Sequence, residues 1–224
     1  MKSILLFLSL AFLPFSALAT CTTDTGHGNQ VLRVVKDWKG HPLDKGARYF
    51  IVSAFNGAGG GGVRLANLGG QDENTCPTSV VQSPRDKDDG IAVYFKPKEP
   101  KHQEIVESAP LNINFYLDYY KCANLTVWKV DHYPKPAEHY TISTGAKLAN
   151  PLDVNSWFQI KSLGSSYKLV FCPYGETFTC QNVGIVSESG YRRLVLTDNA
   201  KAFVFIKDDR IGKVEALSSI TSAF

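Results

Sequence analysis

Two lysines in a proline-rich stretch are the residues whose type and spacing best suggest chemistry in this chain of 224 residues. Lys98 and Lys101 lie in the stretch Lys96 to Glu104, which reads Lys-Pro-Lys-Glu-Pro-Lys-His-Gln-Glu. Each proline fixes its own φ at about −65° and favours extended geometry in the residue before it. A stiff, exposed loop with basic side chains suits insertion into a cleft of another protein, although a solvated charged loop is the simpler interpretation.

No pattern typical of an enzyme active site accompanies these lysines. The sequence has neither a Gly-x-Ser-x-Gly run nor a His-Glu-x-x-His run. Its histidines lack metal-ligand spacing and stand at positions 27, 41, 102, 132 and 139. The run Gly59 to Gly62 is not followed by Gly-Lys-Ser or Gly-Lys-Thr, so we interpret it as a mobile or tight connection between strands rather than a phosphate-binding loop. We predict no enzyme activity, no metal and no cofactor.

The N-terminus predicts entry into the secretory pathway. Met1-Lys2-Ser3 is a short basic head, the following residues up to 18 are mostly apolar, and Ala17-Leu18-Ala19 fits the small-residue pattern of a cleavage site. The apolar stretch is shorter than the roughly 20 residues that a membrane span needs. We therefore expect residues 1–19 to be removed as a signal peptide, and the protein to be secreted to the apoplast or delivered to the vacuole. A formal net charge of +3 is too small to indicate nucleic-acid binding.

Secretion changes how the five cysteines are interpreted, because an oxidising compartment favours disulfides. The chain has no Cys-x-x-Cys pair, which argues against a structural zinc site. Cys172 and Cys180 are close enough in sequence to clip a hairpin, which leaves Cys76 and Cys122 as the natural long bridge. Cys21 then stands unpaired beside the expected mature N-terminus, available to pair with a second chain or a small thiol, or to stay free. We expect a monomer, with Cys21 as the route to any linked dimer.

Short apolar segments separated by turn signals, with little helical periodicity, predict an all-β domain. Closing many short strands into a barrel-like form removes exposed sheet edges. Aromatic residues beside β-branched ones recur in the segments that begin at Val127, Trp157 and Phe203, which suggests an internal repeat. The lysine-rich stretch joins the fourth and fifth predicted strands. The twelve predicted strands are Tyr49 to Ala54, Gly62 to Leu65, Ser79 to Gln82, Ala92 to Phe95, Leu111 to Phe115, Val127 to Val130, Tyr140 to Ser143, Phe158 to Ser162, Tyr167 to Cys172, Val183 to Ser187, Arg193 to Thr197 and Phe203 to Lys207.

Individual motifs, in their order along the chain, resemble the plant Kunitz-type protease inhibitors. The N-terminal signature is Asp37-Trp38-Lys39-Gly40-His41-Pro42-Leu43, followed by Gly46-Ala47-Arg48-Tyr49-Phe50-Ile51-Val52. Further matching runs extend the resemblance from Val34 to Lys207. Leu-Asn-Ile-Asn-Phe at residues 111–115 and Thr-Val-Trp-Lys-Val-Asp at residues 126–131 are most similar to the miraculin-like branch.

This resemblance implies a β-trefoil of twelve strands with threefold pseudo-symmetry. It also implies the disulfides Cys76–Cys122 and Cys172–Cys180, in agreement with the cysteine spacing. We expect one domain over residues 20–207, followed by a flexible tail over residues 208–224.

The resemblance further implies how the lysine-rich stretch works. In relatives that inhibit serine proteases, the loop between the fourth and fifth strands enters the protease cleft in an extended, substrate-like form. Here that loop is Lys96 to Glu104, and the match places Lys101 in the specificity pocket, with Pro100 before it and His102 across the reactive bond. A trypsin-like pocket ends in a buried carboxylate, which a lysine ammonium on its apolar stem neutralises. The implied partner is a serine endopeptidase of trypsin-like specificity.

The chain departs from the inhibitory pattern at one supporting position. Inhibitory relatives commonly place an Asn there, whose amide props the reactive loop, whereas this sequence has Lys45. The loop is also a residue longer than in strict trypsin inhibitors, with Pro97 and Pro100 as a source of stiffness. The alternatives are a non-inhibitory, miraculin-like storage protein or binder of a ligand or receptor, and an inhibitor of cysteine or aspartic proteases through another loop.

A modification site is also indicated. Asn124-Leu125-Thr126 is an N-glycosylation sequon, just after Cys122 and before a predicted strand. In a secreted protein such a sequon predicts a surface glycan on Asn124.

Overall fold

The computed structural model describes residues 32–55, 57, 59–68, 75–99, 101, 103–117, 120–131, 139–173 and 180–210. The predicted signal peptide, Cys21, Pro100 and His102 lie outside these described residues, as does the predicted tail beyond Arg210. The predictions that fall on them stay predictions.

All twelve predicted strands are present. Their β-branched and aromatic residues fit a pleated, half-buried surface. The strands are β1 Tyr49–Ser53, β2 Val63–Ala66, β3 Ser79–Gln82, β4 Val93–Pro97, β5 Leu111–Phe115, β6 Val127–Val130, β7 Ile142–Ala146, β8 Phe158–Leu163, β9 Ser166–Phe171, β10 Gln181–Glu188, β11 Tyr191–Thr197 and β12 Phe203–Lys207. Two short 3₁₀ turns, η1 Tyr120–Cys122 and η2 Val154–Ser156, lie between strands.

The largest shift from prediction is in β7, which was expected over Tyr140 to Ser143. The strand instead runs past that range and through Gly145, which has a φ of 110°, although glycine is depleted in strands. Val127 pairs with Ala146 and Trp128 with Thr144, so Gly145 is the extra residue of a bulge.

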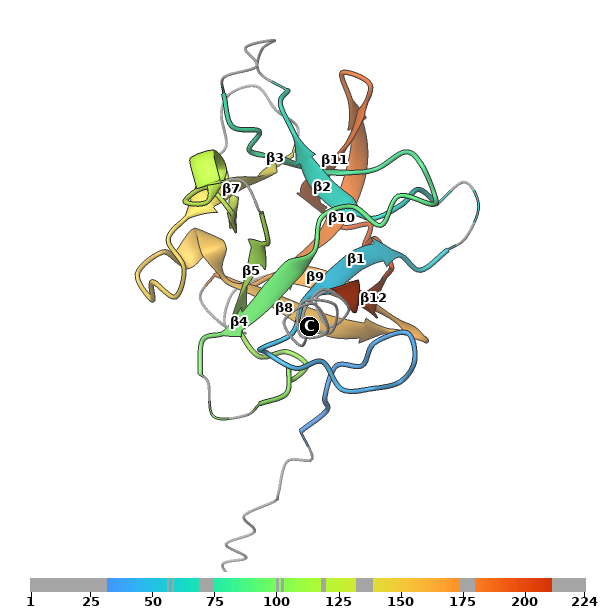
Figure 1. Ribbon diagram of the computed structural model, residues 1–224, viewed down its shortest axis with the longest axis vertical. Coiled ribbons are helices and arrows are strands. Elements are labelled where there is room, and N and C mark those ends of the chain that lie inside the picture. The colour runs from blue at the N-terminus through green and yellow to red at the C-terminus, as the bar shows by residue number, and fades with distance from the viewer. Residues whose placement is uncertain are drawn as a thin grey trace, which may run out of the picture. The chain divides into compact units, whose positions relative to one another are not determined.

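Six strands close into a barrel. β1 pairs with β4, β4 with β5, β5 with β8, β8 with β9, β9 with β12, and β12 with β1, all antiparallel. The other six form the hairpins β2–β3, β6–β7 and β10–β11, and β3 pairs with both β7 and β11 (Figure 1). Each third of the fold therefore repeats a barrel strand, a hairpin and a barrel strand. This is the β-trefoil with threefold pseudo-symmetry that the resemblance implied.

The structure corrects the internal repeat suggested by the sequence. The segment Val127–Val130 is β6, a hairpin strand, whereas the segments beginning near Trp157 and at Phe203 are the barrel strands β8 and β12. Their counterpart in the first repeat is β4. Hydrophobic pattern alone did not separate hairpin from barrel strands, because both bury apolar side chains. The equivalent buried pairs are Val93 and Phe95, Phe158 and Ile160, and Phe203 and Phe205.

Aromatic side chains fill the core. Phe95 meets Phe205 edge to face, with ring centroids 5.4 Å apart. Trp128 lies between Phe115 at 5.4 Å and Phe158 at 6.1 Å. Fully burying one such side chain stabilises a fold by roughly 1.5–3 kcal/mol. This packed core provides a rigid base for the loops at its ends.

The glycine run Gly59–Gly62 is a tight connection, the second of the two alternatives that the sequence left open. A Cβ on Gly62 would lie 1.8 Å from the carbonyl oxygen of Asp89, so only glycine fits there. The carbonyl oxygen of Gly59 accepts hydrogen bonds from Arg192 Nη2 at 3.1 Å and Lys201 Nζ at 3.0 Å. Burial, together with the charge of Arg192, lowers the pKa of Lys201.

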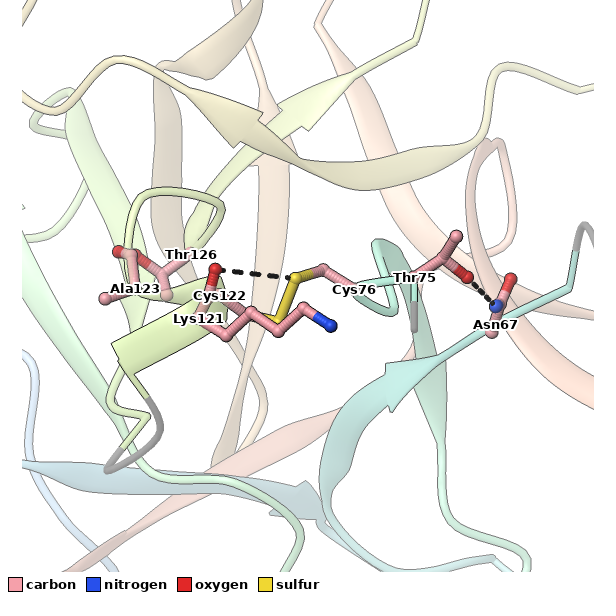
Figure 2. The surroundings of a disulfide bond; sticks show 7 residues. All are labelled: Asn67, Thr75, Cys76, Lys121, Cys122, Ala123 and Thr126. Atoms are coloured by element: carbon pink, nitrogen blue, oxygen red, sulfur yellow. Dashed lines mark hydrogen bonds between the residues drawn. A yellow bond between two sulfur atoms is a disulfide. The ribbon is translucent and has the colours of Figure 1, made fainter. Parts of the chain in front are cut away.

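The structure contains both implied disulfides, Cys76–Cys122 and Cys172–Cys180. Figure 2 shows the first, which joins the segment before β3 to η1. The Cys76 sulfur lies 3.7 Å from the carbonyl oxygen of Lys121. This is a van der Waals contact and not a hydrogen bond, because a disulfide sulfur has no proton to donate. This disulfide therefore links the segment that precedes β3 to the segment that precedes β6.

Candidate functional site

The candidate reactive loop begins later than its sequence motif. Lys96 and Pro97 are the last residues of β4 and pair with Asn112 and Leu111 of β5. The Lys98 N–H then donates to the carbonyl oxygen of Pro110 at 2.9 Å. The loop between β4 and β5 (Figure 1) therefore spans residues 98–110. The hydrogen bond between Lys98 and Pro110 joins its two ends.

The C-terminal arm of this loop pairs with the segment that precedes β1. The backbone of Lys45 contributes a donor to this pairing, at the position where inhibitory relatives commonly have Asn. The arm is thereby held like a short added strand. The bonds are Lys45 N–H to Gln103 O, Ile105 N–H to Leu43 O, Val35 N–H to Ile105 O and Glu107 N–H to Arg33 O, at 2.8–2.9 Å.

Strand β8 provides a second anchor for the same arm. The Ser108 N–H donates to the carbonyl oxygen of Ile160 at 2.9 Å, and Ser108 turns the chain with a φ of 60°. The carboxylate of Glu107 accepts from the Ser162 hydroxyl at 2.7 Å and from the Ser162 N–H at 3.3 Å. Hydrogen bonds to a charged acceptor are stronger than those between neutral groups, so Glu107 is an effective tether.

The N-terminal arm carries Lys98, whose ammonium lies 5.5 Å from the centroid of the Trp157 ring. Trp157 is only 4% exposed, which gives this cation–π contact a fixed platform. Lys98 is therefore directed back toward the residues just before β8.

Lys101 has a different environment. Its side chain is 77% exposed, and its Nζ lies 3.2 Å from Oε2 of Glu99, which is 75% exposed. An ion pair this accessible to water contributes little to stability and is readily broken. A cationic side chain on a loop with anchored arms is suited to enter an anionic pocket of another protein. Pro100 and His102, predicted on either side of it, lie outside the described residues.

Sequence reasoning missed the residues that hold the loop. Glu107 and Ser162 are 55 positions apart, and no motif connects them. Trp157 was noted only as part of a matching run. The contacts depend on how β8 packs beside β5, which sequence pattern does not report.

Asn124 of the predicted sequon is exposed in the turn between η1 and β6. The hydroxyl of Thr126 donates to the carbonyl oxygen of Ala123 at 3.2 Å. The position is accessible, and its glycosylation stays a prediction.

Within the described part of the chain, no group of three or more His, Cys, Asp or Glu side chains is placed to hold a metal ion. No helix in that part is long and apolar enough to cross a membrane.

Comparison with known proteins gives consistent matches. A family model described as trypsin and protease inhibitor matches residues 35–207. The chain is 39% identical over 183 residues to the latex serine proteinase inhibitor of Carica papaya, covering 79% of this chain and 97% of that protein. It is 33% identical over 215 residues to miraculin of Synsepalum dulcificum, covering 91% and 97%. The solved structure of a Kunitz-type cysteine protease inhibitor from potato matches with a TM-score of 0.65 and 30% identity, over 80% of this chain and 99% of that one.

The structural match agrees with the β-trefoil fold of this protein. Identity to miraculin is lower than identity to the papaya inhibitor, so assignment to a miraculin-like branch stays a prediction. The matching family model describes protease inhibitors, not enzymes. Since the family model covers most of the chain and the trefoil is shared with a solved relative, this protein belongs to the plant Kunitz-type family of trypsin and protease inhibitors.

Proposed function

We propose that this protein inhibits serine endopeptidases of trypsin-like specificity, with Lys101 entering the specificity pocket. The observation that supports this most is the exposed ammonium of Lys101 on a loop whose arms are fixed to the barrel and to the segment before β1. The papaya relative, named a serine proteinase inhibitor, supports the same class of target.

Binding replaces the weak, solvated pair with Glu99 by a desolvated pair between the ammonium and the carboxylate at the base of the pocket. The anchored arms lower the entropy that the loop loses on binding. A standard interface of this kind buries roughly 800 Å² on each partner.

The same anchoring distinguishes an inhibitor from a substrate. After cleavage between Lys101 and His102, both arms would remain attached to the fold. Holding the new ends together gives them a high effective concentration, which favours resealing of the bond over release. Following the predicted signal peptide, we place this activity in the apoplast or the vacuole.

The test is titration of trypsin, chymotrypsin and papain with the purified mature protein and with Lys101→Ala. We expect tight trypsin inhibition by the wild type and at least about a hundredfold weaker inhibition by the variant, the loss typical of a central contact residue. Lys98→Ala is the matched control, because Lys98 is on the same loop but directed to Trp157. Its inhibition constant should change less than about tenfold.

Mass spectrometry of the trypsin mixture completes the test. Slow, partial cleavage between Lys101 and His102 supports the substrate-like mechanism. Rapid and complete cleavage without inhibition would show that the loop is only a substrate and would overturn the proposal. Papain inhibition that persists in Lys101→Ala would assign that activity to another loop, as the similarity to the potato cysteine protease inhibitor suggests.

A further inference from the structure

A cavity of about 340 Å³ lies beneath the loop that joins β4 to β5. This volume is at the lower end of the range for small-molecule sites, roughly 300–1,000 Å³. Its apolar wall is made by Leu32, Pro97, Ile105, Val106, Pro110 and Leu111. Leu32 is half exposed, so apolar surface at this cavity remains in contact with water. A guest molecule would cover it.

The charges around the cavity favour a neutral guest. Two lysines and two glutamates line it, so their formal charges cancel: Lys98, Lys101, Glu99 and Glu104. Of these, Lys101 and Glu99 pair directly across 3.2 Å. Lys98 also lines it, but its ammonium lies over the Trp157 ring, so its aliphatic stem is the part available to the cavity. The recognisable chemistry is therefore that of a neutral, largely apolar small molecule.

The cavity wall includes both arms of the loop. Pro97 and Lys98 come from the N-terminal arm and the end of β4, and Ile105 and Val106 come from the C-terminal arm. A guest in contact with both arms gains contacts that exist only when the arms hold this arrangement. It would shift the loop toward that arrangement and reduce the ordering cost of protease binding.

We infer that this cavity binds a neutral, largely apolar small molecule, and that the guest strengthens protease inhibition by stiffening the loop above it. The second part rests on the proposed function, whereas the first does not. Because coupling between two ligands is reciprocal, the guest should bind the inhibitor–protease complex more tightly than the free inhibitor by the same factor.

The binding test uses N-phenyl-1-naphthylamine, a neutral fluorescent probe, titrated with the mature protein in the absence of protease. We expect saturable binding with one probe per chain. Ala109→Phe places a bulky ring on the cavity wall and should weaken binding at least tenfold. Ala123→Phe, on the exposed turn before β6 and not part of the wall, is the matched control and should bind as the wild type does.

Leu32→Asn is a second variant, and it introduces no larger side chain that the fold would have to accommodate. Because Leu32 is half exposed, the polar replacement should not disturb the core. It should weaken binding of the probe several-fold and leave the thermal unfolding temperature unchanged. Absence of saturable binding, or equal affinity in the wild type, Ala109→Phe and Leu32→Asn, would overturn the site.

The coupling test measures trypsin inhibition with and without saturating probe. We expect the inhibition constant of the wild type to fall several-fold and that of Ala109→Phe to be unaffected. Probe binding without any change in the inhibition constant would overturn the coupling. A wild type that binds the probe but never inhibits trypsin would refute the proposed function and leave the binding site supported, so the two failures are distinguishable.

Discussion

Lys101 and Glu99 form an exposed ion pair on the candidate loop. Both side chains are about three-quarters exposed, and their charged atoms are 3.2 Å apart. For the ammonium to reach a protease carboxylate, it must leave Glu99. The pair therefore opposes binding by an amount equal to its small strength in the free protein, which for exposed pairs is about 0.2–1 kcal/mol.

Glu99→Gln should tighten trypsin inhibition by up to about fivefold, because the ammonium no longer has to leave an ion pair. The measurement is the inhibition constant for trypsin at low salt and at about 1 M salt. High salt screens exposed charges, so the advantage of the variant should disappear there.

Glu104→Gln is the control for this change. It removes the same charge from the same loop, but within the described residues Glu104 forms no ion pair with Lys101. An equal gain from Glu104→Gln would show that overall loop charge, and not the pair, is responsible.

At the scale of elements, the loop depends on two neighbours that are distant from it in sequence. The segment before β1 supplies backbone donors and acceptors, and β8 supplies the Ser162 donors to Glu107. The barrel places β8 beside β5 through the pairing of Leu111 with Phe158. Threefold closure of the sheet is thus what brings a strand of the second repeat to the base of this loop.

Ser162→Ala removes the hydroxyl that Glu107 accepts from and should loosen the C-terminal arm. Because this site is exposed, we expect a loss of only about 1 kcal/mol in global stability. Trypsin inhibition should weaken several-fold, and cleavage between Lys101 and His102 should become faster. Kinetic assays and mass spectrometry measure the two effects.

Ser187→Ala, on an exposed position of β10, is the comparison variant and should leave both quantities unchanged. Equal cleavage rates in wild type and Ser162→Ala would show that the tether to β8 does not stiffen the loop.

At the scale of the whole molecule, the barrel closes where its first and last strands meet. Beside this seam, Asp208 forms an ion pair with Arg48 at 3.2 Å, and both side chains are buried. The Arg48 guanidinium also stacks over the Tyr116 ring at 3.9 Å. Burial alone would raise the pKa of Asp208, but hydrogen bonds from Arg210 and the charge of Arg48 outweigh it, so the pKa is lowered.

A carboxyl group with a lowered folded-state pKa stabilises the fold above its unfolded-state value of about 3.9, and this contribution is lost as pH falls through the folded-state pKa. The protein should therefore lose stability in acid. Asp208→Asn cannot titrate and leaves Arg48 buried without its partner. We expect it to be about 3–5 kcal/mol less stable at pH 7 and to show a flatter pH dependence below pH 4.

Urea unfolding between pH 2 and pH 7 measures the free energy of unfolding of the wild type and of Asp208→Asn. Asp88, whose pKa is also lowered, should leave a residual acid dependence in the variant. Glu188→Gln breaks the more exposed pair with Arg193 and should cost less than about 1 kcal/mol. If Asp208→Asn were no more destabilising than Glu188→Gln, the buried pair would not be a major contributor to stability.

Much of this protein is determined by the sequence itself. The pattern of β-branched and aromatic residues predicted all twelve strands, since strand formation depends largely on local side-chain pattern. Secretion signals and cysteine spacing indicated the two disulfides, and family motifs identified the fold and located Lys101 on its loop.

The tertiary structure decided what local pattern does not encode. It separated barrel strands from hairpin strands, placed Lys96 and Pro97 inside β4, and directed Lys98 toward Trp157 while Lys101 stays exposed. It also supplied the loop's anchors on the segment before β1 and on β8, and the cavity under the loop. These features arise from contacts between residues far apart in the chain, which exist only after the barrel has closed.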